Sequence, residues 1–181
     1  PKFLHPGPGF GGSCFPKDTK AFAALSKAQG LRMKTIEAAI ETNDIQKKIM
    51  VDKMKNLMGG NFDGKQIAVL GLAFKPNTDD IRDSASITMI DSIIKGGGHI
   101  RAYDPIANQS MKNIFPDLNY FMSWEEASKG ADGVAIMTEW NEFRGISLSF
   151  LKSLLKSPII LDTRNIFSIE NLEKNNFKYD N

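Results

Sequence analysis

The chain has 181 residues, of which 41% are hydrophobic and 24% charged, and its net charge is +2. This composition is ordinary for a globular protein, and so small a net charge gives no reason to expect nucleic acid or an anionic membrane surface as a partner. We expect neither a transmembrane helix, which needs ~20 apolar residues, nor a signal peptide. The single cysteine cannot form an intramolecular disulfide, which favours a cytoplasmic location and leaves a thiol for chemistry.

The first third of the chain is expected to be helical. Residues 1–16 are dense in Gly and Pro and predict an irregular loop. Asp18 or Thr19 can cap a helix that Gly30 would end as the C′ residue. In the next stretch apolar residues recur at i, i+3 and i+4, which predicts a long helix over residues 33–57.

The long helix would carry more apolar surface than the short segment before it can cover. Its apolar positions are Ile36, Ala39, Ile40, Ile45, Ile49, Met50 and Met54. At 1.5 Å per residue the helix would be roughly 37 Å long, and burying its apolar face calls for a partner. A two-fold copy of the same helix is the commonest arrangement, so we expect a homodimer through residues 33–57. A helix packed only on its own α/β domain is the alternative.

From about residue 61 the pattern changes to strands that alternate with helices. Strand patterns occur at residues 65–71, 100–103, 119–122, 133–137 and 159–162, with a possible edge strand near Phe177. Helical patterns occur at residues 86–95, 111–115, 124–129, 148–155 and 169–174. This alternation predicts a parallel sheet covered on both faces. We therefore divide the chain into a cysteine loop with a helical segment, residues 1–60, and a doubly wound α/β domain, residues 61–181.

The first candidate site is the run PGPGFGGSCFPKDTKAF at residues 6–22. Its glycines let the backbone approach a ligand closely and adopt positive φ. Cys14 precedes the expected cap by four residues, so it should lie near a helix N-terminus, where the helix dipole and the Lys17 cation favour the thiolate. Asp18 could cap that helix or hold a water. From these residues alone, a structural cysteine in a tight turn is an equally good interpretation.

Two further candidates follow strands of the α/β domain. The run LGLAFKPNTDDIRDSAS at residues 70–86 places Lys75 and Arg82 beyond the first strand, where open α/β sheets bind ligands. The run lacks the G-x-G-x-x-G fingerprint of a dinucleotide site, and a solvated loop is the commoner interpretation of such charges. Arg164 in LDTRN follows a later strand and is either a ligand contact or a surface arginine paired with Asp162.

We expect no ligand-binding role for the other polar residues. His99 is expected to begin a strand, and the TEW run at residues 138–140 is interpreted as structural. Asp104 ends a strand like a ribose-binding acid, but it lies 33 positions after Gly71, against the ~20 expected in a dinucleotide site. No group of His, Cys and Asp residues has metal-ligand spacing, so we expect no metal.

The run GPGFGGSCFPKDT resembles the active-site cysteine motif of the UDP-glucose/GDP-mannose dehydrogenase family. The run at residues 70–86 resembles the second motif of that family, at the start of its UDP-binding domain, and the likeness extends from residue 1 to about residue 175. The resemblance implies an NAD-dependent oxidation of a nucleotide sugar at C6, from alcohol to carboxylate. It implies an aldehyde first, then a thiohemiacetal and a thioester on the cysteine.

The resemblance also implies a role for each matching residue. Cys14 would be the nucleophile, and Asp18 would assist the hydrolytic water. Lys17 and Arg82 would contact NAD, because a cation suits a pyrophosphate. The residues expected to contact the substrate are Phe3, Leu4, His5, Pro6, Gly7, Gly11, Lys75 and Arg164.

The chain begins inside a motif and without methionine, so we expect it to be part of a longer protein. The resemblance implies an upstream Rossmann domain for NAD, together with a catalytic Lys and Asn, and it matches residues 33–57 to a central dimerisation helix. Without the upstream part the segment is expected to be inactive. Residues 13–17 and 80–84 look most like members that act on UDP-glucose, with GDP-mannose and UDP-N-acetylmannosamine as competing substrates. The rival class is a non-catalytic module that binds a nucleotide and dimerises.

Overall fold

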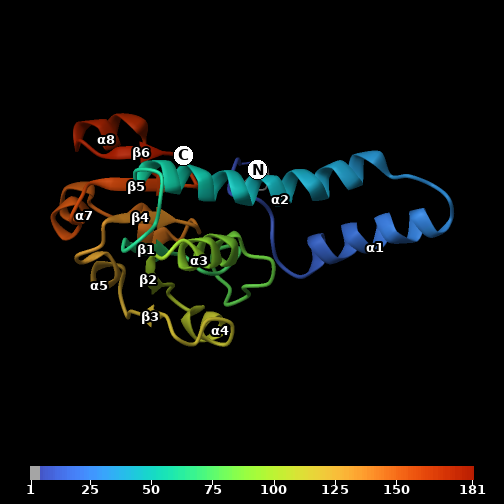
Figure 1. Ribbon diagram of the computed structural model, residues 1–181, viewed down its shortest axis with the longest axis horizontal. Helices are drawn as coiled ribbons and strands as arrows, with labels where there is room; N and C mark the ends of the chain where they lie inside the picture. The colour runs from blue at the N-terminus through green and yellow to red at the C-terminus, as the bar shows by residue number, and fades with distance from the viewer. Residues whose placement is uncertain (1–4) are drawn as a thin grey trace.

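The computed structural model describes residues 5–181, which form an α/β body and a projecting helical arm (Figure 1). The arm consists of α1 (Cys14–Ala28) and the first half of α2 (Lys34–Leu57), which lie antiparallel to each other. The second half of α2 returns to the body and packs over the sheet. None of the helices within residues 5–181 combines the length and the apolar character that crossing a membrane requires.

The body is built on a sheet of six parallel strands in the order β3-β2-β1-β4-β5-β6. The strands are β1 (Gln66–Leu70), β2 (His99–Tyr103), β3 (Asn119–Tyr120), β4 (Gly133–Ile136), β5 (Ile159–Asp162) and β6 (Lys178–Asp180). This is the Rossmann order, in which the chain reverses direction between β1 and β4 and ligands bind beyond the carboxyl ends of the strands. The predicted doubly wound parallel sheet is confirmed.

Helices cover both faces of the sheet (Figure 1). Each face carries its own core, because successive side chains of a strand point to opposite sides. Ile67 and Val69 belong to one core, shared with α2 and α3, whereas Ala68 and Leu70 belong to the other. The helices of the body are α3 (Ala85–Lys95), α4 (Asn108–Lys112), α5 (Trp124–Ser128), α6 (Asn141–Arg144), α7 (Leu148–Leu154) and α8 (Ile169–Lys174). Of these, α6 was missed from the sequence, since four residues are too few to show a helical period.

The observed start of α1 differs from the predicted one. The helix begins at Cys14, with Ser13 in the cap position, so Asp18 and Thr19 lie inside the helix instead of capping it. Pro16 occupies the first turn, where its missing N–H costs no helical hydrogen bond. The irregular loop therefore ends at residue 13 and not at residue 16.

The predicted end of α1 is confirmed. Gly30 has a φ of +71°, and its N–H donates to the Lys27 carbonyl at 3.0 Å. The N–H of Leu31 donates to the Ser26 carbonyl at 2.9 Å. These two bonds form a Schellman motif, which satisfies the last carbonyls of the helix.

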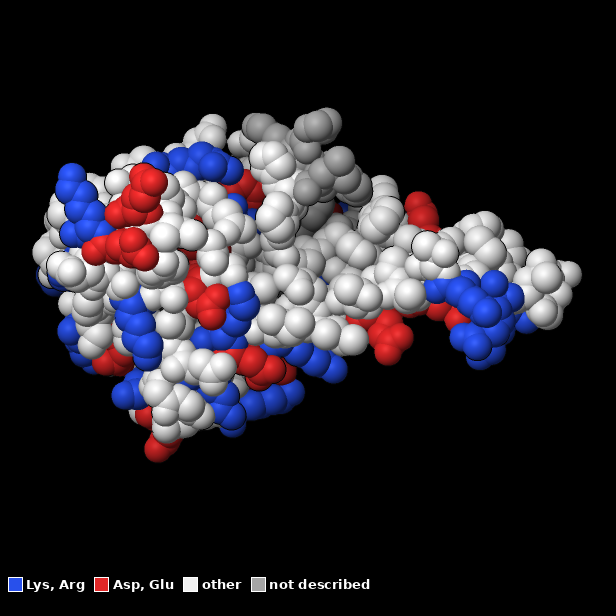
Figure 2. Space-filling view, turned by 90° about the horizontal axis from the view of Figure 1, so that it is seen from above, with Lys and Arg blue, Asp and Glu red and all other residues white. Residues whose placement is uncertain are grey.

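The apolar residues of α2 do not form one continuous face. Met50 and Met54 are buried in the core of the body, and Ile40 is half-buried in a small hollow that Phe10 of the cysteine loop also lines. Ile45 and Ile49 are 47% and 40% exposed. Figure 2 shows that the surface where the arm leaves the body is mostly uncharged. The middle of α2 therefore presents apolar side chains that its own chain leaves partly exposed.

Candidate active site

The cysteine loop, residues 5–13, is docked against the β1–α3 loop, residues 71–84. The N–H of Gly12 donates to the Arg82 carbonyl at 2.7 Å. Gly12 has a φ of +86°, and a Cβ there would lie 2.7 Å from the Phe74 ring. A Cβ on Gly11 would lie 2.6 Å from the Asp83 carbonyl oxygen. Glycine is therefore required at both positions, and the two sequence motifs meet in space.

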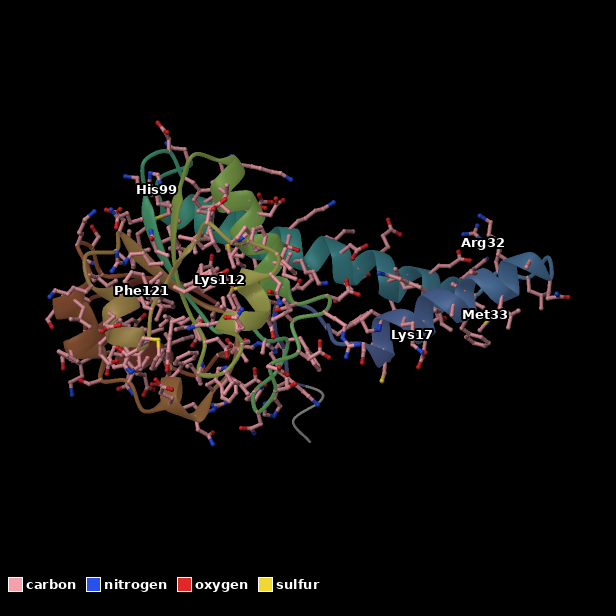
Figure 3. All side chains as sticks on the ribbon, turned by 90° about the horizontal axis from the view of Figure 1, so that it is seen from below. Lys17, Arg32, Met33, His99, Lys112 and Phe121 are labelled. Atoms are coloured by element: carbon pink, nitrogen blue, oxygen red, sulfur yellow. The ribbon has the colours of Figure 1, made fainter. Side chains whose placement is uncertain are left out.

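Cys14 is exposed at the first position of α1, a helix of 15 residues, with its Sγ 3.7 Å from Ser13 Oγ. Figure 3 shows Lys17 at the end of α1 nearer the body, whereas Arg32 and Met33 lie at the far end of the arm. The pKa of Lys17 is raised, mainly by its hydrogen bond and ion pair with Asp18 at 2.9 Å and, to a smaller extent, by Cys14. The thiol thus lies within electrostatic range of a cation, at a helix N-terminus.

Arg82 belongs to the β1–α3 loop, and its carbonyl is the one that accepts from Gly12, two residues before Cys14. Its Nε and Nη2 donate to Asp80 at 2.9 and 2.7 Å, a two-pronged contact that orients the guanidinium. The pKa of Arg82 is raised, first by this hydrogen bond and then by the charges of Asp80 and Cys14. Lys75 is exposed in the same loop, with its Nζ 5.3 Å from the Phe74 ring centroid, and its charge also helps to lower the pKa of Asp80.

Arg164 follows β5 and ties three segments together. Its Nε donates to the Met137 carbonyl at 2.9 Å and its Nη2 to the Phe74 carbonyl at 3.1 Å. The ion partner is Glu139, with Oε2 at 3.1 Å from Nε, and the Arg164 side chain is only 16% exposed. Burial lowers the pKa of Arg164, and the Glu139 charge opposes that shift. The alternative of a surface arginine paired with Asp162 is therefore wrong. The Arg164 side chain is largely buried and pairs with Glu139. Asp162 instead accepts the backbone N–H of Arg164.

The remaining predicted substrate residues lie along the cysteine loop. A Cβ on Gly7 would lie 3.1 Å from Nη1 of Arg164, so the loop passes directly over this guanidinium. His5 and Pro6 are exposed, and Phe3 and Leu4 lie outside the described residues. An open hollow of about 310 Å³ adjoins the loop, and it is lined by Pro6, Gly7, Gln46, Ile49, Met50, Lys53, Thr163, Asn165 and Asn181.

Comparison with known proteins identifies the family. Residues 68–169 match the model of the UDP-glucose/GDP-mannose dehydrogenase family, UDP binding domain, and residues 1–45 match the central domain of the same family. The chain belongs to this family.

Two relatives show how much of a family member the chain represents. The UDP-glucose 6-dehydrogenase of Rhizobium meliloti (strain 1021) is 40% identical over 178 residues, which are 98% of this chain and 41% of that protein. TuaD, a UDP-glucose 6-dehydrogenase of Bacillus subtilis (strain 168), is 43% identical over 98% of this chain and 39% of that protein. The chain therefore spans about two fifths of the length of the relatives that it matches.

Solved structures agree with the fold. A UDP-glucose dehydrogenase from the archaeon Pyrobaculum islandicum superimposes with a TM-score of 0.83 at 30% identity, covering 97% of this chain and 38% of that chain. A UDP-D-ManNAc dehydrogenase from Pyrococcus horikoshii superimposes with a TM-score of 0.79 at 26% identity, covering 96% and 38%. The arm and the parallel sheet are thus shared with nucleotide-sugar dehydrogenases that act on different sugars.

Asp104, at the end of β2, has a structural role in this family member. Its Oδ2 accepts from the backbone N–H groups of Leu72 and Ala73 at 2.7 and 3.1 Å, and from Trp140 Nε1 at 3.1 Å. A carboxylate in this position binds a ribose in many dinucleotide folds, but here the chain itself occupies it. His99 begins β2, as predicted, and is exposed far from the arm (Figure 3).

Three side chains of α2 that were not predicted from the sequence hold these loops. Asn43 and Gln46 bond the cysteine loop, and Lys47 bonds the β1–α3 loop. The available signal was the spacing of Asn43 and Lys47, which continue the buried stripe of Met50 and Met54 with polar residues. Within residues 5–181 no group of three or more His, Cys, Asp or Glu side chains could hold a metal ion.

Proposed function

We propose that this segment supplies the thiol and the UDP-binding half of an NAD-dependent dehydrogenase that oxidises UDP-glucose to UDP-glucuronate. The observation that carries the proposal is the docking of the cysteine loop on the β1–α3 loop through Gly12 and Arg82. This contact docks the loop that precedes Cys14 on the segment that follows β1, and open α/β folds bind their ligands beyond the carboxyl ends of their strands.

Cys14 is the proposed nucleophile. Its thiolate adds to the C6 aldehyde, and the resulting oxygen takes up a proton to give a thiohemiacetal. Loss of a hydride and of the hydroxyl proton gives a thioester. Hydrolysis by water then releases the carboxylate, the thiolate and two protons. Asp18 lies four residues further along α1, so its carboxylate lies on the same side of the helix as Cys14. Its proposed role is to hold or deprotonate the water that cleaves the thioester.

NAD, when bound, accepts the hydride in each of the two oxidations. Lys17 and Arg82 are the proposed contacts, with side chains 73% and 68% exposed next to the thiol. Exposed cations of this kind suit an anionic pyrophosphate, so the residues present fit the cofactor.

The nucleotide sugar is proposed to lie against Lys75, Arg164 and the loop from Phe3 to Gly7, together with Gly11. Lys75 can neutralise a phosphate, and Arg164 holds the loop over the ends of β4 and β5. UDP-glucose is proposed because relatives that are 39–43% identical over most of this chain are named UDP-glucose 6-dehydrogenases. GDP-mannose and UDP-N-acetylmannosamine are the competing substrates.

We further propose a homodimer formed through residues 33–57, and a division of labour between residues 1–60 and residues 61–181. The dimer is supported by α1, whose buried residues are only Pro16 and Ser26. A helix with so little buried surface gains its stability from a partner. A nucleotide-sugar substrate and a single free cysteine favour a cytoplasmic location, where UDP-glucuronate would serve polysaccharide synthesis.

The deciding experiment is an NADH assay of the full-length protein with UDP-glucose, GDP-mannose and UDP-N-acetylmannosamine. We expect kcat/KM to be highest for UDP-glucose, by about tenfold or more, with two NADH formed per UDP-glucuronate. A preference for another nucleotide sugar would overturn the substrate. Binding of UDP-glucose without NADH formation would favour the non-catalytic module.

A further inference from the structure

The buried stripe of α2 changes character along the helix. Over the sheet the stripe is apolar, with Met50 and Met54 in the core of the body. Where the helix leaves the body, the same stripe continues as Asn43 and Lys47, each 8% exposed. A buried polar side chain needs a hydrogen-bond partner, and both of these find their partners in loops of the proposed active site.

Asn43 holds the middle of the cysteine loop by two hydrogen bonds. Its Oδ1 accepts from the Phe10 N–H at 2.7 Å, and its Nδ2 donates to the Phe10 carbonyl at 3.1 Å. Gly9 permits this approach, because a Cβ there would lie 2.7 Å from the same Oδ1. The Phe10 ring packs edge-on against Phe15 with centroids 4.6 Å apart. The contact with Asn43 therefore reaches the residue next to Cys14.

Gln46 holds one end of the same loop, and Lys47 holds the β1–α3 loop on which it docks. Gln46 Nε2 donates to the Gly7 carbonyl at 3.1 Å, where the cysteine loop crosses Arg164. Lys47 Nζ donates to the Asp83 carbonyl at 2.9 Å, on the β1–α3 loop. Asp83 has a φ of +52°, in the left-handed region, which aspartate adopts more readily than most other non-glycine residues.

Resting on the proposed function, we propose that Asn43, Gln46 and Lys47 are positioning residues that set Cys14 and Arg82 in register for the acid-forming step. The three side chains lie at i, i+3 and i+4 on one rigid helix, so they face the loops together. Their proposed action is through the backbones of Phe10, Gly7 and Asp83, without contact to substrate or cofactor.

Substitutions at adjacent lysines give a matched test in the full-length protein. Lys47→Met keeps the aliphatic stem but removes the donor, Lys47→Arg restores a donor, and Lys48→Met makes the same change at an exposed position of α2. With UDP-glucose we expect Lys47→Met to lower kcat roughly 10- to 100-fold, because small misplacements of reacting groups have effects of that size. KM should change by less than about threefold, Lys47→Arg should recover much of kcat, and Lys48→Met should match the wild type.

Asn43→Ala provides a second readout that does not depend on turnover. Hydrogen exchange, followed residue by residue in the same full-length protein, should show faster exchange of the Phe10 and Gly12 amides, with α3 unchanged. Exchange that stays at the wild-type rate at both amides would overturn the proposal, and so would an unchanged kcat in Lys47→Met. If the wild-type protein forms no NADH with any of the three nucleotide sugars, the proposed function fails. The exchange result then decides alone whether these side chains hold the loop.

Discussion

Cys14 is an exposed thiol at the start of α1, and its replacement by serine tests the chemistry most directly. In the full-length enzyme we expect Cys14→Ser to lower the formation of UDP-glucuronate by more than about 10³-fold, the order of effect seen when a nucleophile is removed. A serine ester hydrolyses far less readily than a thioester, so an acid product should not be released. Product analysis by chromatography measures this, and UDP binding by calorimetry should stay unchanged. Normal production of the acid would refute the role of Cys14.

Gly12 and Gly30 form a matched pair for testing how the cysteine loop docks. Both have positive φ, +86° and +71°, but only at Gly12 would a Cβ meet the Phe74 ring, at 2.7 Å. Gly30→Ala should lower the free energy of unfolding by about 1–2 kcal/mol, through backbone strain alone. Gly12→Ala should lower it by a further 1–3 kcal/mol or so, because the crowded ring must move. Urea unfolding compares the two, and equal losses would contradict this account of the docking.

Arg164 and Glu139 should be coupled in stability. Arg164→Met removes two hydrogen bonds to backbone carbonyls and leaves the largely buried Glu139 carboxylate without its cation. Because Glu139 is still partly exposed, we expect a loss of about 2–3 kcal/mol, below the full effect of breaking a buried pair. Adding Glu139→Gln should recover about 1 kcal/mol of that loss. Denaturant unfolding of the single and double variants measures the coupling, and strictly additive effects would argue against the pair.

Single residues can be proposed from the sequence where their motif is local. Cys14 and Arg82 lie in runs whose glycines and strand ends make them candidates, and the family resemblance of those runs implies their roles. Asn43 could not be found in this way, since its partner Phe10 is 33 positions away and an asparagine inside a helix has no local signature. Asp104 was recognised as a strand-end acid, but only the fold shows that the backbone of the β1–α3 loop occupies its oxygens.

Among the elements, the long strands of the sheet could be placed to within about one residue. Buried parallel strands are continuous apolar runs, and those of β1 and β4 are bounded by glycine or polar residues that mark their ends. The start of α1 was missed because Pro16 was assigned to the loop, although a helix tolerates proline in its first turn. Some α2 side chains lie in the core, some against the loops and some in solvent. Tertiary contacts decide which, and the helical period of the sequence does not predict those contacts.

The outer face of α2 is where we expect the dimer contact. Ile45 is 47% exposed there, so Ile45→Glu should convert the homodimer to monomers by placing a charge in an apolar interface. Ile106→Glu makes the same change at an isoleucine of the body that is 52% exposed, and it should remain dimeric. Light scattering measures the mass of each.

Ile40→Glu, at another apolar position of the predicted helix, is less informative. Ile40 lines the small hollow beside Phe10, so a charge there would also disturb the cysteine loop. A wild-type protein that is monomeric at high micromolar concentration would refute the dimer, and an Ile45→Glu variant that stays dimeric would place the interface elsewhere.

At the scale of the whole molecule, the segment of 181 residues is expected to bind a nucleotide without completing the reaction. Its β1–α3 loop lacks the G-x-G-x-x-G fingerprint, and Asp104 is occupied by the chain itself. We expect no NADH formation by the purified segment with UDP-glucose and NAD, while UDP binds weakly and loses affinity in Lys75→Ala. Absorbance and calorimetry measure the two properties, and NADH formation by the segment would contradict the expectation.

The continuity of α2 restricts how the length of this protein can vary during evolution. One unbroken helix of 24 residues joins the core of the body to the loop that carries Cys14. Inserting a single residue between Lys47 and Met50 would turn one end about 100° relative to the other and shift it by about 1.5 Å. Asn43 would then face away from Phe10 while Met54 stayed in the core. Insertions and deletions should therefore be tolerated in the turn at residues 29–33, where a Cβ on Gly30 would meet nothing within 4 Å, and be excluded from residues 43–54.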